Sequence, residues 1–592
     1  MKKLLNDPAS VVPDMLDGLV ALNPELTWLP HSGVVIRADA QSAAAQGEVA
    51  LISGGGSGHE PAHAGYVGPG MLSAAVAGEV FTSPSTDAVL DAIRAVAGAA
   101  GVLLIVKNYT GDRFNFGLAA EIARSEGIPV EMVIVADDVA LSASGEHAGR
   151  RGLAGTVLVH KIAGAAAAER RPLKEVAQIA REAAAALGTM GVALTPCTVP
   201  AAGRPGFTLG DDEIEWGLGI HGEPGVRRGA LEPAGAIVET LLSTIIDDLK
   251  LATHDRVALL VNNLGGTPAS ELAIVAGDAI RYLRARNVRI ERAWSGTFLS
   301  ALDMAGVSLT LLRVDEARLG WLDAATRTSA WPLVGGHPSE ATRHAPVRDE
   351  TAQTGPGLSV ESTLRHVIEA ICDDLIAAEA TLTQMDHHVG DGDFGTSAAR
   401  VARAVRSTID TCPPESAPAD VLRALSATVR RVMGGTSGPL YAVMLLRAAS
   451  ELGKTGRMPD ARAWSHAFSA AVEGVMELGG ARPGDRTMVD ALDPAARALR
   501  GALDASDAAP SDGPARHAVV PGIAPQTSPE TGLEAAIEAA RRGAAETANM
   551  TPKRGRSSYV GERALGFVDP GAHAVGLWLD AIRRALARGR ER

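Results

Sequence analysis

VLLIVKNYTG, residues 102–111, is an apolar run that ends in a lysine, polar residues and a glycine. Similar runs occur at EVALISGGG (48–56), VEMVIVADD (130–138), RVALLVNNLGG (256–266) and VSLTLLRV (307–314), and Ala-rich helical segments separate several of them. Apolar strands that alternate with helices are typical of mostly parallel sheets covered on both faces. The sequence therefore predicts an α/β domain over residues 1–334, with ligands bound where its strands end.

The rest of the chain has a different pattern. Residues 335–357, GGHPSEATRHAPVRDETAQTGPG, lack periodicity and are rich in Pro, Gly and charge, which is typical of a linker. Residues 358–592 show helical spacing of apolar residues and no convincing strand, so we expect an all-helical domain there. The Pro- and Ser-rich stretch at 503–531 is predicted to be an insertion loop between two helices.

The composition argues against a nucleic-acid partner and against a membrane span. The 592 residues carry a net charge of -13 and only 3% are aromatic, so neither a broad basic surface nor stacking platforms for bases are expected. No stretch reaches the roughly 18 apolar residues that a transmembrane helix needs. No apolar signal-peptide core follows the N-terminal lysines, so a cytoplasmic location is the default expectation.

The segment MDHHVGDGDFGTS (385–397) carries three carboxylates within eight residues, Asp386, Asp391 and Asp393. Carboxylates this close repel one another unless a cation holds them, and Mg²⁺ prefers oxygen ligands that it shares with substrate phosphates. The glycines let the backbone approach phosphates, and the helix that follows presents its N-terminus. A solvated turn that merely caps this helix explains the isolated pattern equally well. The adjacent His387 and His388 are interpreted as solvent-facing.

Three more Gly-rich turns occur in the helical part. They are VMGGTSGPLYA (432–442), GGARPGDRTMVDAL (479–492) and KRGRSSYVGERALGFVDPGAHAV (553–575). Each is a weak signal alone, but four polar loops exceed what the helix connections require. Together they predict one nucleotide site at an end of the bundle.

The first part of the chain offers candidate polar groups after its strands. SGGGSGHEPAHAGYVGPG (53–70) places His59 in a glycine loop whose spacing does not give a dinucleotide-binding fingerprint. Lys107 and Asp112 follow the next strand and suit anchoring and proton abstraction from a hydroxyl, although a surface ion pair is an equal alternative. His221, in GLGIHGEPG, is either an ordinary loop residue or a nucleophile or general base held in a tight turn.

Taken together, ISGGGSGHEPAH, IVKNYTGDRFNF, GLGIHGEPG, MDHHVGDGDFGTS, GGTSGPLY and PGDRTMVDAL closely resemble the single-chain, ATP-using dihydroxyacetone kinases. The resemblance covers nearly the whole chain apart from the linker and the 503–531 insertion. It implies transfer of the γ-phosphate of ATP to a hydroxyl of dihydroxyacetone or a similar small ketose. It also implies that His221 holds the ketone as a hemiaminal, that His59 assists acid–base chemistry and that Asp112 is the base. The implied ketose-binding residues are Gly56, Ser57, Gly58, His59, Lys107 and Asp112.

The same resemblance implies an ATP domain shaped as a barrel of antiparallel helices. Asp386, Asp391 and Asp393 would hold two Mg²⁺ ions, and chains would pair as homodimers with the helical domain of one over the substrate domain of the other. Phe394 and Ser397 depart from the small or polar residue and the threonine that relatives often carry in this loop. The implied nucleotide contacts are Phe394, Gly395, Thr396, Ser397, Thr436, Ser437, Gly438, Gly479, Met488, Arg556, Asp569, Pro570 and Gly571.

Other activities stay open within this resemblance. Some relatives phosphorylate four-carbon ketoses such as erythrulose, and some split FAD into a cyclic flavin phosphate. A non-catalytic ketose-binding regulator would lack the metal loop, whereas this chain has all three aspartates. A phosphotransferase-system enzyme that retains ADP normally carries the two domains on separate chains, which are fused here.

Overall fold

The computed structural model describes residues 2–141, 149–203, 205–223, 225–332, 336–338, 359–360, 362–390, 392–411, 415–454, 459–507, 529–554 and 557–590. The chain divides into two compact units, residues 1–344 and 345–592. Most of the predicted linker and of the 503–531 insertion lies outside the described residues. Among the helices described, none combines the length and the apolar character needed to cross a membrane.

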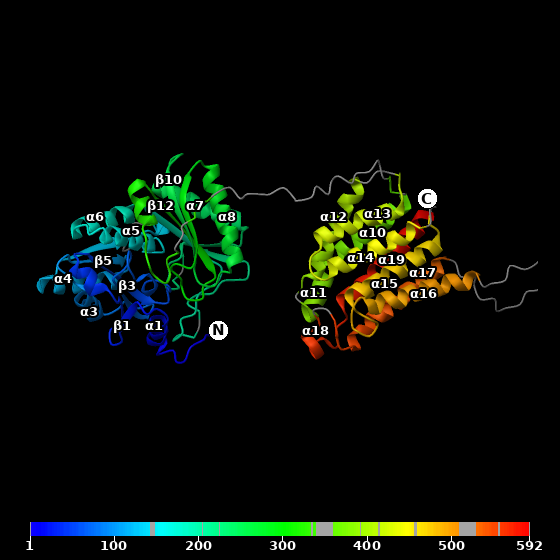
Figure 1. Ribbon diagram of the computed structural model, residues 1–592, viewed down its shortest axis with the longest axis horizontal. Coiled ribbons are helices and arrows are strands. Elements are labelled where there is room, and N and C mark those ends of the chain that lie inside the picture. The colour runs from blue at the N-terminus through cyan, green and yellow to red at the C-terminus, as the bar shows by residue number, and fades with distance from the viewer. Residues whose placement is uncertain are drawn as a thin grey trace, which may run out of the picture. The chain divides into compact units, whose positions relative to one another are not determined.

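The first unit is built from strands and helices that alternate along the chain (Figure 1). The strands are β1 (Leu26–Leu29), β2 (Val34–Arg37), β3 (Ala50–Ser57), β4 (Ala74–Val80), β5 (Val102–Lys107), β6 (Val130–Val135), β7 (Leu187–Ala193), β8 (Glu213–Trp216), β9 (Arg227–Ala230), β10 (Arg256–Asn263), β11 (Arg289–Gly296) and β12 (Gly306–Arg313). The helices are α1 (Val11–Leu22), α2 (Ala40–Ala45), α3 (Thr86–Val96), α4 (Thr110–Ser125), α5 (Thr156–Ala168), α6 (Leu173–Ala185), α7 (Ala234–Leu249), α8 (Ala269–Ala285) and α9 (Glu316–Asp323).

These strands form two six-stranded sheets of different character. The first has the order β1-β2-β4-β3-β5-β6, and its β4-β3, β3-β5 and β5-β6 pairs are parallel. The second has the order β11-β10-β12-β7-β8-β9, and only its β10-β11 pair is parallel. The α/β prediction is confirmed, but "mostly parallel" is wrong for the second sheet. Its β7 and β12 are buried along nearly their whole length, and burial on both faces looks the same in sequence for either strand direction.

Helices cover both faces of each sheet, which explains the long apolar runs. In β5, Leu103 and Ile105 pack into a core that also contains residues of α5 and α6, whereas Leu104 packs with α3 and α4 on the opposite face. In β10, Leu260 belongs to the core shared with α5 and α6, and Leu259 packs against α7 and α8. The shared core therefore lies between the two sheets and fixes the loops that leave their strands.

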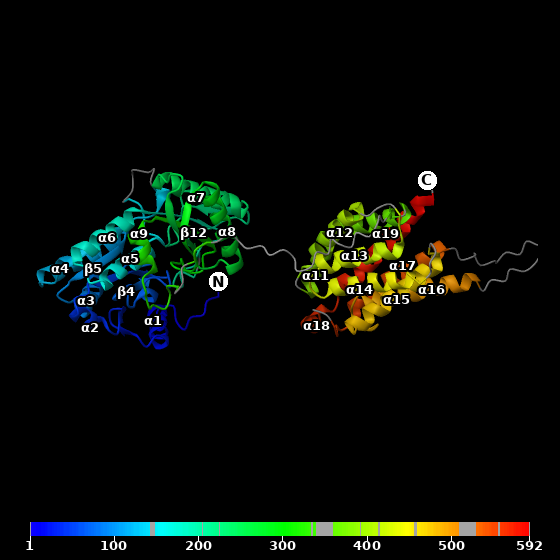
Figure 2. The same cartoon turned by 45° about the horizontal axis from the view of Figure 1, so that its top comes forward.

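In the described part of the second unit the regular structure is helical, apart from the two-residue strands β13 (Ser359–Val360) and β14 (Glu415–Ser416). Contacts between helices run α10-α12-α13-α14-α15-α16-α17-α19 and return to α10, which closes a ring. Figure 2 shows helices of this ring packed together in one bundle. Apolar side chains fill most of its interior and leave a cavity of about 480 Å³. The predicted helical barrel is confirmed. Its helices are α10 (Ser362–Ala377), α11 (Glu379–Val389), α12 (Phe394–Thr411), α13 (Pro418–Val432), α14 (Ser437–Leu452), α15 (Ala461–Gly479), α16 (Val489–Asp507), α17 (Pro529–Glu546), α18 (Ser557–Val560) and α19 (Pro570–Arg590).

Candidate functional site

His59 lies in the glycine loop that leaves β3 and is completely buried. Its Nδ1 lies 2.9 Å from the carbonyl oxygen of Ser300, and a carbonyl can only accept, so Nδ1 carries the ring proton. The other nitrogen, Nε2, is buried and has no hydrogen-bond partner among the described residues. It is therefore a bare acceptor that a ligand hydroxyl can satisfy. The ring stacks on Phe81 with centroids 5.2 Å apart.

The glycines of this loop allow close approach of other groups. A Cβ at Gly56 would lie 2.5 Å from the backbone nitrogen of Thr82, and one at Gly58 would lie 2.8 Å from the Phe81 ring. A Cβ at Gly55 would lie 2.6 Å from Lys107 Nζ and 3.4 Å from Asp112 Oδ2. A side chain at Gly55 would thus occupy the space in which the ammonium and the carboxylate approach the loop.

Lys107 and Asp112 come from consecutive elements, the end of β5 and the first turn of α4. Both are buried, at 0% and 4% exposure. Burial lowers the pKa of Lys107, and the negative charge of Asp112 opposes that effect. The alternative of a surface ion pair is therefore wrong, because neither group is at the surface.

His221 follows β8 and lies against the same group of residues. Its ring meets that of His59 edge to face with centroids 4.8 Å apart, and the Tyr109 ring at 4.5 Å. Burial lowers the pKa of His221 to about 4. Burial also lowers the pKa of His59 well below its usual value, and the positive charge of Lys107 adds to this. Both imidazoles are therefore neutral near pH 7, as a nucleophile or an acceptor must be.

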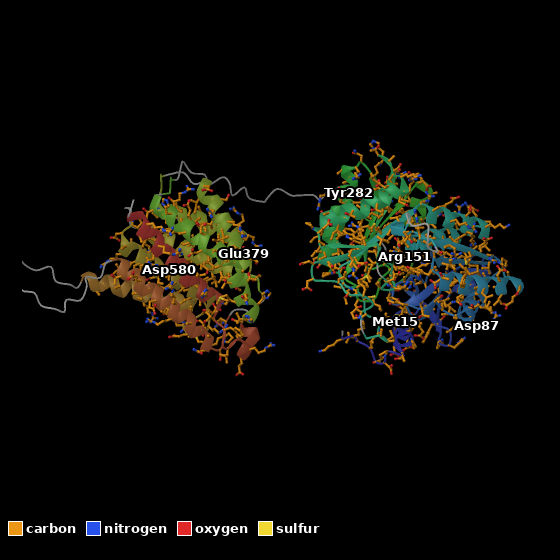
Figure 3. The ribbon with its side chains drawn as sticks, turned by 180° about the vertical axis from the view of Figure 1, so that it is seen from behind. Met15, Asp87, Arg151, Tyr282, Glu379 and Asp580 are labelled. Atoms are coloured by element: carbon orange, nitrogen blue, oxygen red, sulfur yellow. The ribbon has the colours of Figure 1, made fainter. Side chains whose placement is uncertain are left out.

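A polar network that the sequence did not reveal holds the His221 loop. The backbone N–H of His221 donates to Glu223 Oε2 at 2.8 Å, and Arg151 Nη1 lies 3.4 Å from Glu223 Oε1. Arg151, labelled in Figure 3, also donates to Asp138 Oδ2 and to the carbonyl oxygen of Gly217, each at 2.7 Å. Because Asp138 follows β6 and Gly217 follows β8, this guanidinium joins the ends of both sheets behind the histidine.

The second unit has a cavity of about 510 Å³ at one end of its ring. The N-terminal residues of four helices line it, namely Phe394 of α12, Ser437 of α14, Val489 of α16 and Pro570 of α19. Helix N-termini carry unpaired N–H groups and the positive end of the helix dipole. Four of them around one cavity suit a polyanion such as a nucleotide phosphate chain.

Most of the described residues predicted to contact a nucleotide line this cavity. Gly395, Thr396 and Gly438 do not: a Cβ at Gly395 would meet the Glu379 carbonyl oxygen at 2.2 Å, and one at Gly438 the Met433 carbonyl oxygen at 1.9 Å. These two glycines serve helix packing, and the exposed Thr396 bonds through its hydroxyl to the Asp393 carbonyl. Arg556 lies outside the described residues. The predicted residues that line the cavity are Phe394, Ser397, Thr436, Ser437, Gly479, Met488, Asp569, Pro570 and Gly571.

Two of the three carboxylates predicted to bind Mg²⁺ line the same cavity, although no three His, Cys, Asp or Glu side chains among the described residues are grouped closely enough to hold a metal ion. Asp386, Asp393 and Asp569 line it, and Asp391 lies outside the described residues. Burial raises the pKa of Asp569 to about 6, and the negative charges of Asp490 and Asp386 act in the same direction. Carboxylates that repel one another at the edge of a phosphate-sized cavity are the oxygen donors that Mg²⁺ takes.

Arg486 is a cavity residue that sequence analysis missed, although its motif PGDRTMVDAL was noted. It is fully buried and donates to the carbonyl oxygens of Thr547, Ala564 and Phe567 at 2.8–3.1 Å. Its Nη1 is buried without a hydrogen-bond partner among the described residues. The side chain thus fastens the segments before α19 and places a positive charge at the cavity wall.

Comparisons with known proteins match both units of the chain. Residues 17–330 match the Dak1 domain family, and residues 388–512 and 513–584 match the DAK2 domain family. The chain is 44% identical over 597 residues to triokinase/FMN cyclase of Homo sapiens, which covers 99% of each chain. It is 36% identical over 594 residues to D-erythrulose kinase of Mycolicibacterium smegmatis, which covers 98% of this chain and 97% of that one.

A solved structure also aligns with the whole chain. The crystal structure of the dihydroxyacetone kinase from C. freundii in complex with AMP-PNP and Mg²⁺ covers 99% of both chains at 35% identity, with a TM-score of 0.60. The resemblance noted from the sequence motifs is thereby confirmed. The chain belongs to the dihydroxyacetone kinase family, in the form that carries the Dak1 and DAK2 domains on one polypeptide.

Proposed function

We propose that this protein transfers the γ-phosphate of ATP to a hydroxyl of dihydroxyacetone or a similar small ketose. One observation carries the proposal: two neutral imidazoles, an ammonium and a carboxylate from four chain segments meet in one buried place of the first unit. The names of the relatives support the donor and the substrate class, because they include a triokinase, a D-erythrulose kinase and a kinase crystallised with an ATP analogue and Mg²⁺.

In this proposal His221 captures the ketone. A bare ring nitrogen adds to the carbonyl carbon, the C=O bond becomes a single bond, and the oxygen ends as a hydroxyl with the proton that the ring gives up. Glycerol has no carbonyl and is rejected at this step. Lys107 contacts a substrate oxygen, and Nε2 of His59 accepts a hydrogen bond from a substrate hydroxyl.

Asp112 removes the proton from the hydroxyl that attacks the γ-phosphorus, and the bond to the β–γ bridging oxygen breaks to release ADP. The nucleotide lies in the cavity of the second unit, with phosphates towards the four helix N-termini. Asp386, Asp391 and Asp393 would hold Mg²⁺, and the predicted number of ions is two. Bound Mg²⁺ would neutralise charge on the phosphates of the nucleotide.

The substrate panel that tests this function uses dihydroxyacetone, glyceraldehyde, erythrulose and glycerol, each with Mg-ATP. We expect ADP release with dihydroxyacetone, erythrulose and glyceraldehyde, each of which has a carbonyl group, and none above background with glycerol. Equal rates with glycerol would contradict capture of the carbonyl. A higher kcat/KM for erythrulose would assign the four-carbon sugar as the substrate, the alternative that the D-erythrulose kinase relative favours.

A second activity is favoured by the human relative named triokinase/FMN cyclase. Cleavage of FAD to AMP and a cyclic flavin phosphate would use the same nucleotide cavity. Incubation with FAD and Mn²⁺, followed by chromatography of the flavin products, tests it. FAD recovered intact would exclude this activity.

Ketose binding should persist in mildly acidic solution. The folded-state pKa of His221 is lowered from 6.5 to about 4, so its imidazole stays neutral until the pH falls towards 4. Calorimetric binding of dihydroxyacetone without nucleotide should therefore be nearly equal at pH 7 and pH 5.5. A midpoint near pH 6.5 would show instead that the ring is solvated and titrates normally.

The family resemblance further implies a homodimer in which one chain's helical domain serves the other chain's ketose site. Co-expression of His221→Ala with Asp386→Asn chains tests this arrangement. If chains assort at random, half of the dimers are mixed and hold one intact pair of sites, so about one quarter of wild-type activity should return. No recovery, with dimers demonstrated, would place both domains of each active site in one chain.

A further inference from the structure

Behind Lys107 lies a row of buried side chains that the proposed mechanism does not use. Nζ of Lys107 is 2.8 Å from Nε2 of His63, and Nδ1 of His63 is 3.0 Å from Nε2 of His160. Lys107 and His160 are 0% exposed and His63 is 6% exposed. The three come from β5, the glycine loop after β3, and α5, so their contacts depend on the tertiary fold.

The hydrogen-bond roles along this row are fixed by its neighbours. The Ser53 hydroxyl donates to the carbonyl oxygen of Ile105 at 2.7 Å, so its oxygen can only accept from His63 Nδ1 at 3.4 Å. Nδ1 of His63 therefore carries the proton and donates to both Ser53 and His160, which leaves the proton of His160 on its Nδ1, a buried nitrogen without a hydrogen-bond partner among the described residues. Nε2 of His63 is then a bare acceptor facing Lys107, which as an ammonium has donors only.

The buried surroundings of Lys107 make Nε2 of His63 important as an acceptor for its ammonium. Besides His63 and His160, the titratable groups that act on Lys107 are Asp112 from α4, His59 from the glycine loop and His221 from the loop after β8. A fully buried ammonium is costly unless its donors are satisfied. Burial lowers the pKa of His160 to about 3, so that ring is neutral and adds no positive charge to the row.

We propose that His63 is a positioning residue for the kinase reaction: locked as the Nδ1–H tautomer by Ser53 and His160, it keeps Lys107 charged and directed at the ketose beside Asp112. His160 acts one step further back, through His63. The inference rests on the proposed function and adds two residues to it. Nε2 of His63 offers its lone pair to Lys107, so Lys107 stays an ammonium. Lys107 then donates a hydrogen bond to the substrate oxygen rather than accepting one.

The test is the alkaline limb of the pH profile of kcat/KM for dihydroxyacetone, at saturating Mg-ATP. His63→Leu removes the acceptor, so the limb should move to lower pH by about one unit or more. His160→Leu weakens the tautomer lock and should move the limb in the same direction by less. His63→Gln restores an amide oxygen that can accept from the ammonium, so this variant should recover most of the wild-type profile.

The double variant separates a relay from two independent effects. If His160 acts through His63, His63→Leu/His160→Leu should shift the limb no further than His63→Leu alone. Val157→Ala, also buried on α5, is the packing control and should lower the melting temperature while the limb stays in place. Melting curves for all variants identify any that fail to fold. If His63→Leu does not fold, the pH profiles of His160→Leu and His63→Gln still test the role of His63.

The outcomes distinguish this inference from the proposed function. A wild-type protein that releases no ADP with any ketose overturns the function. Wild-type activity with the alkaline limb unmoved in both leucine variants, or moved equally in Val157→Ala, overturns the role of His63. A glutamine variant no better than leucine would show that the ring does not act as an acceptor.

Discussion

Replacing His221 by alanine is expected to lower kcat/KM for the ketose by about 10³-fold or more, because covalent capture supplies both affinity and alignment. The ring stands among Tyr109, Phe81 and His59, whose rings it meets edge to face at centroid distances of 4.5–5.3 Å. Steady-state ADP release with dihydroxyacetone and with glycerol measures the effect.

The His221→Ala variant should also lose its discrimination between dihydroxyacetone and glycerol. Wild-type protein is expected to bind dihydroxyacetone far more tightly than glycerol, and His221→Ala to bind both weakly. His31→Ala is the matched control, because that side chain is 71% exposed and pairs with Asp91 on α3. Retained preference for the ketone in His221→Ala would show that hydrogen bonds alone, without a covalent bond, select the substrate.

Removing the charge of Asp386 or Asp393 should reduce turnover by about 10²-fold or more, since cation stabilisation of the phosphates contributes several kcal/mol. Asparagine is the right replacement at Asp386, whose Oδ2 accepts from the backbone N–H of Phe394 at 3.1 Å, because the amide oxygen preserves that bond at the start of α12. ADP release as a function of Mg²⁺ concentration is the measurement. Asp391→Ala, predicted from the sequence, should behave in the same way.

Ketose binding should survive these changes, since the proposed ketose site lies in the other unit. Asp373→Asn is the control, because its carboxylate is 60% exposed and pairs with Arg406 on the surface of the helical unit. Full activity at ordinary Mg²⁺ in Asp386→Asn and Asp393→Asn would refute the metal assignment. Weakened ketose binding would instead indicate that the variants disturb folding.

The order of the two domains could be predicted because apolar periodicity is a local property. The runs at β3, β5 and β10 are buried on both faces, and helical spacing marks the second unit from α10 onwards. Lys107 and Asp112 could be found in the same way, since one ends a recognisable strand and the other lies in the first turn of the helix that follows it.

Other parts of the site left no local signal. Direction in the second sheet was mispredicted because β12 and β7 pair antiparallel although their residues are as buried as those of a parallel strand. Gly395 and Gly438 looked like phosphate-loop glycines, whereas contacts with Glu379 and Met433 explain them. Arg486 gave no sign of burial, because its three acceptors lie 61 to 81 residues away along the chain.

By itself the sequence determined the family, the two-domain order and the chemical types at the site, because motifs and periodicity are written in neighbouring residues. Only the tertiary structure decided which groups share hydrogen bonds: His63 and His160 behind Lys107 are separated by 97 residues, and Arg151 and Glu223 behind His221 by 72. The physical reason is that a hydrogen bond requires two atoms within about 3 Å, and for residues so far apart in the chain only the packing of sheets and helices brings them that close.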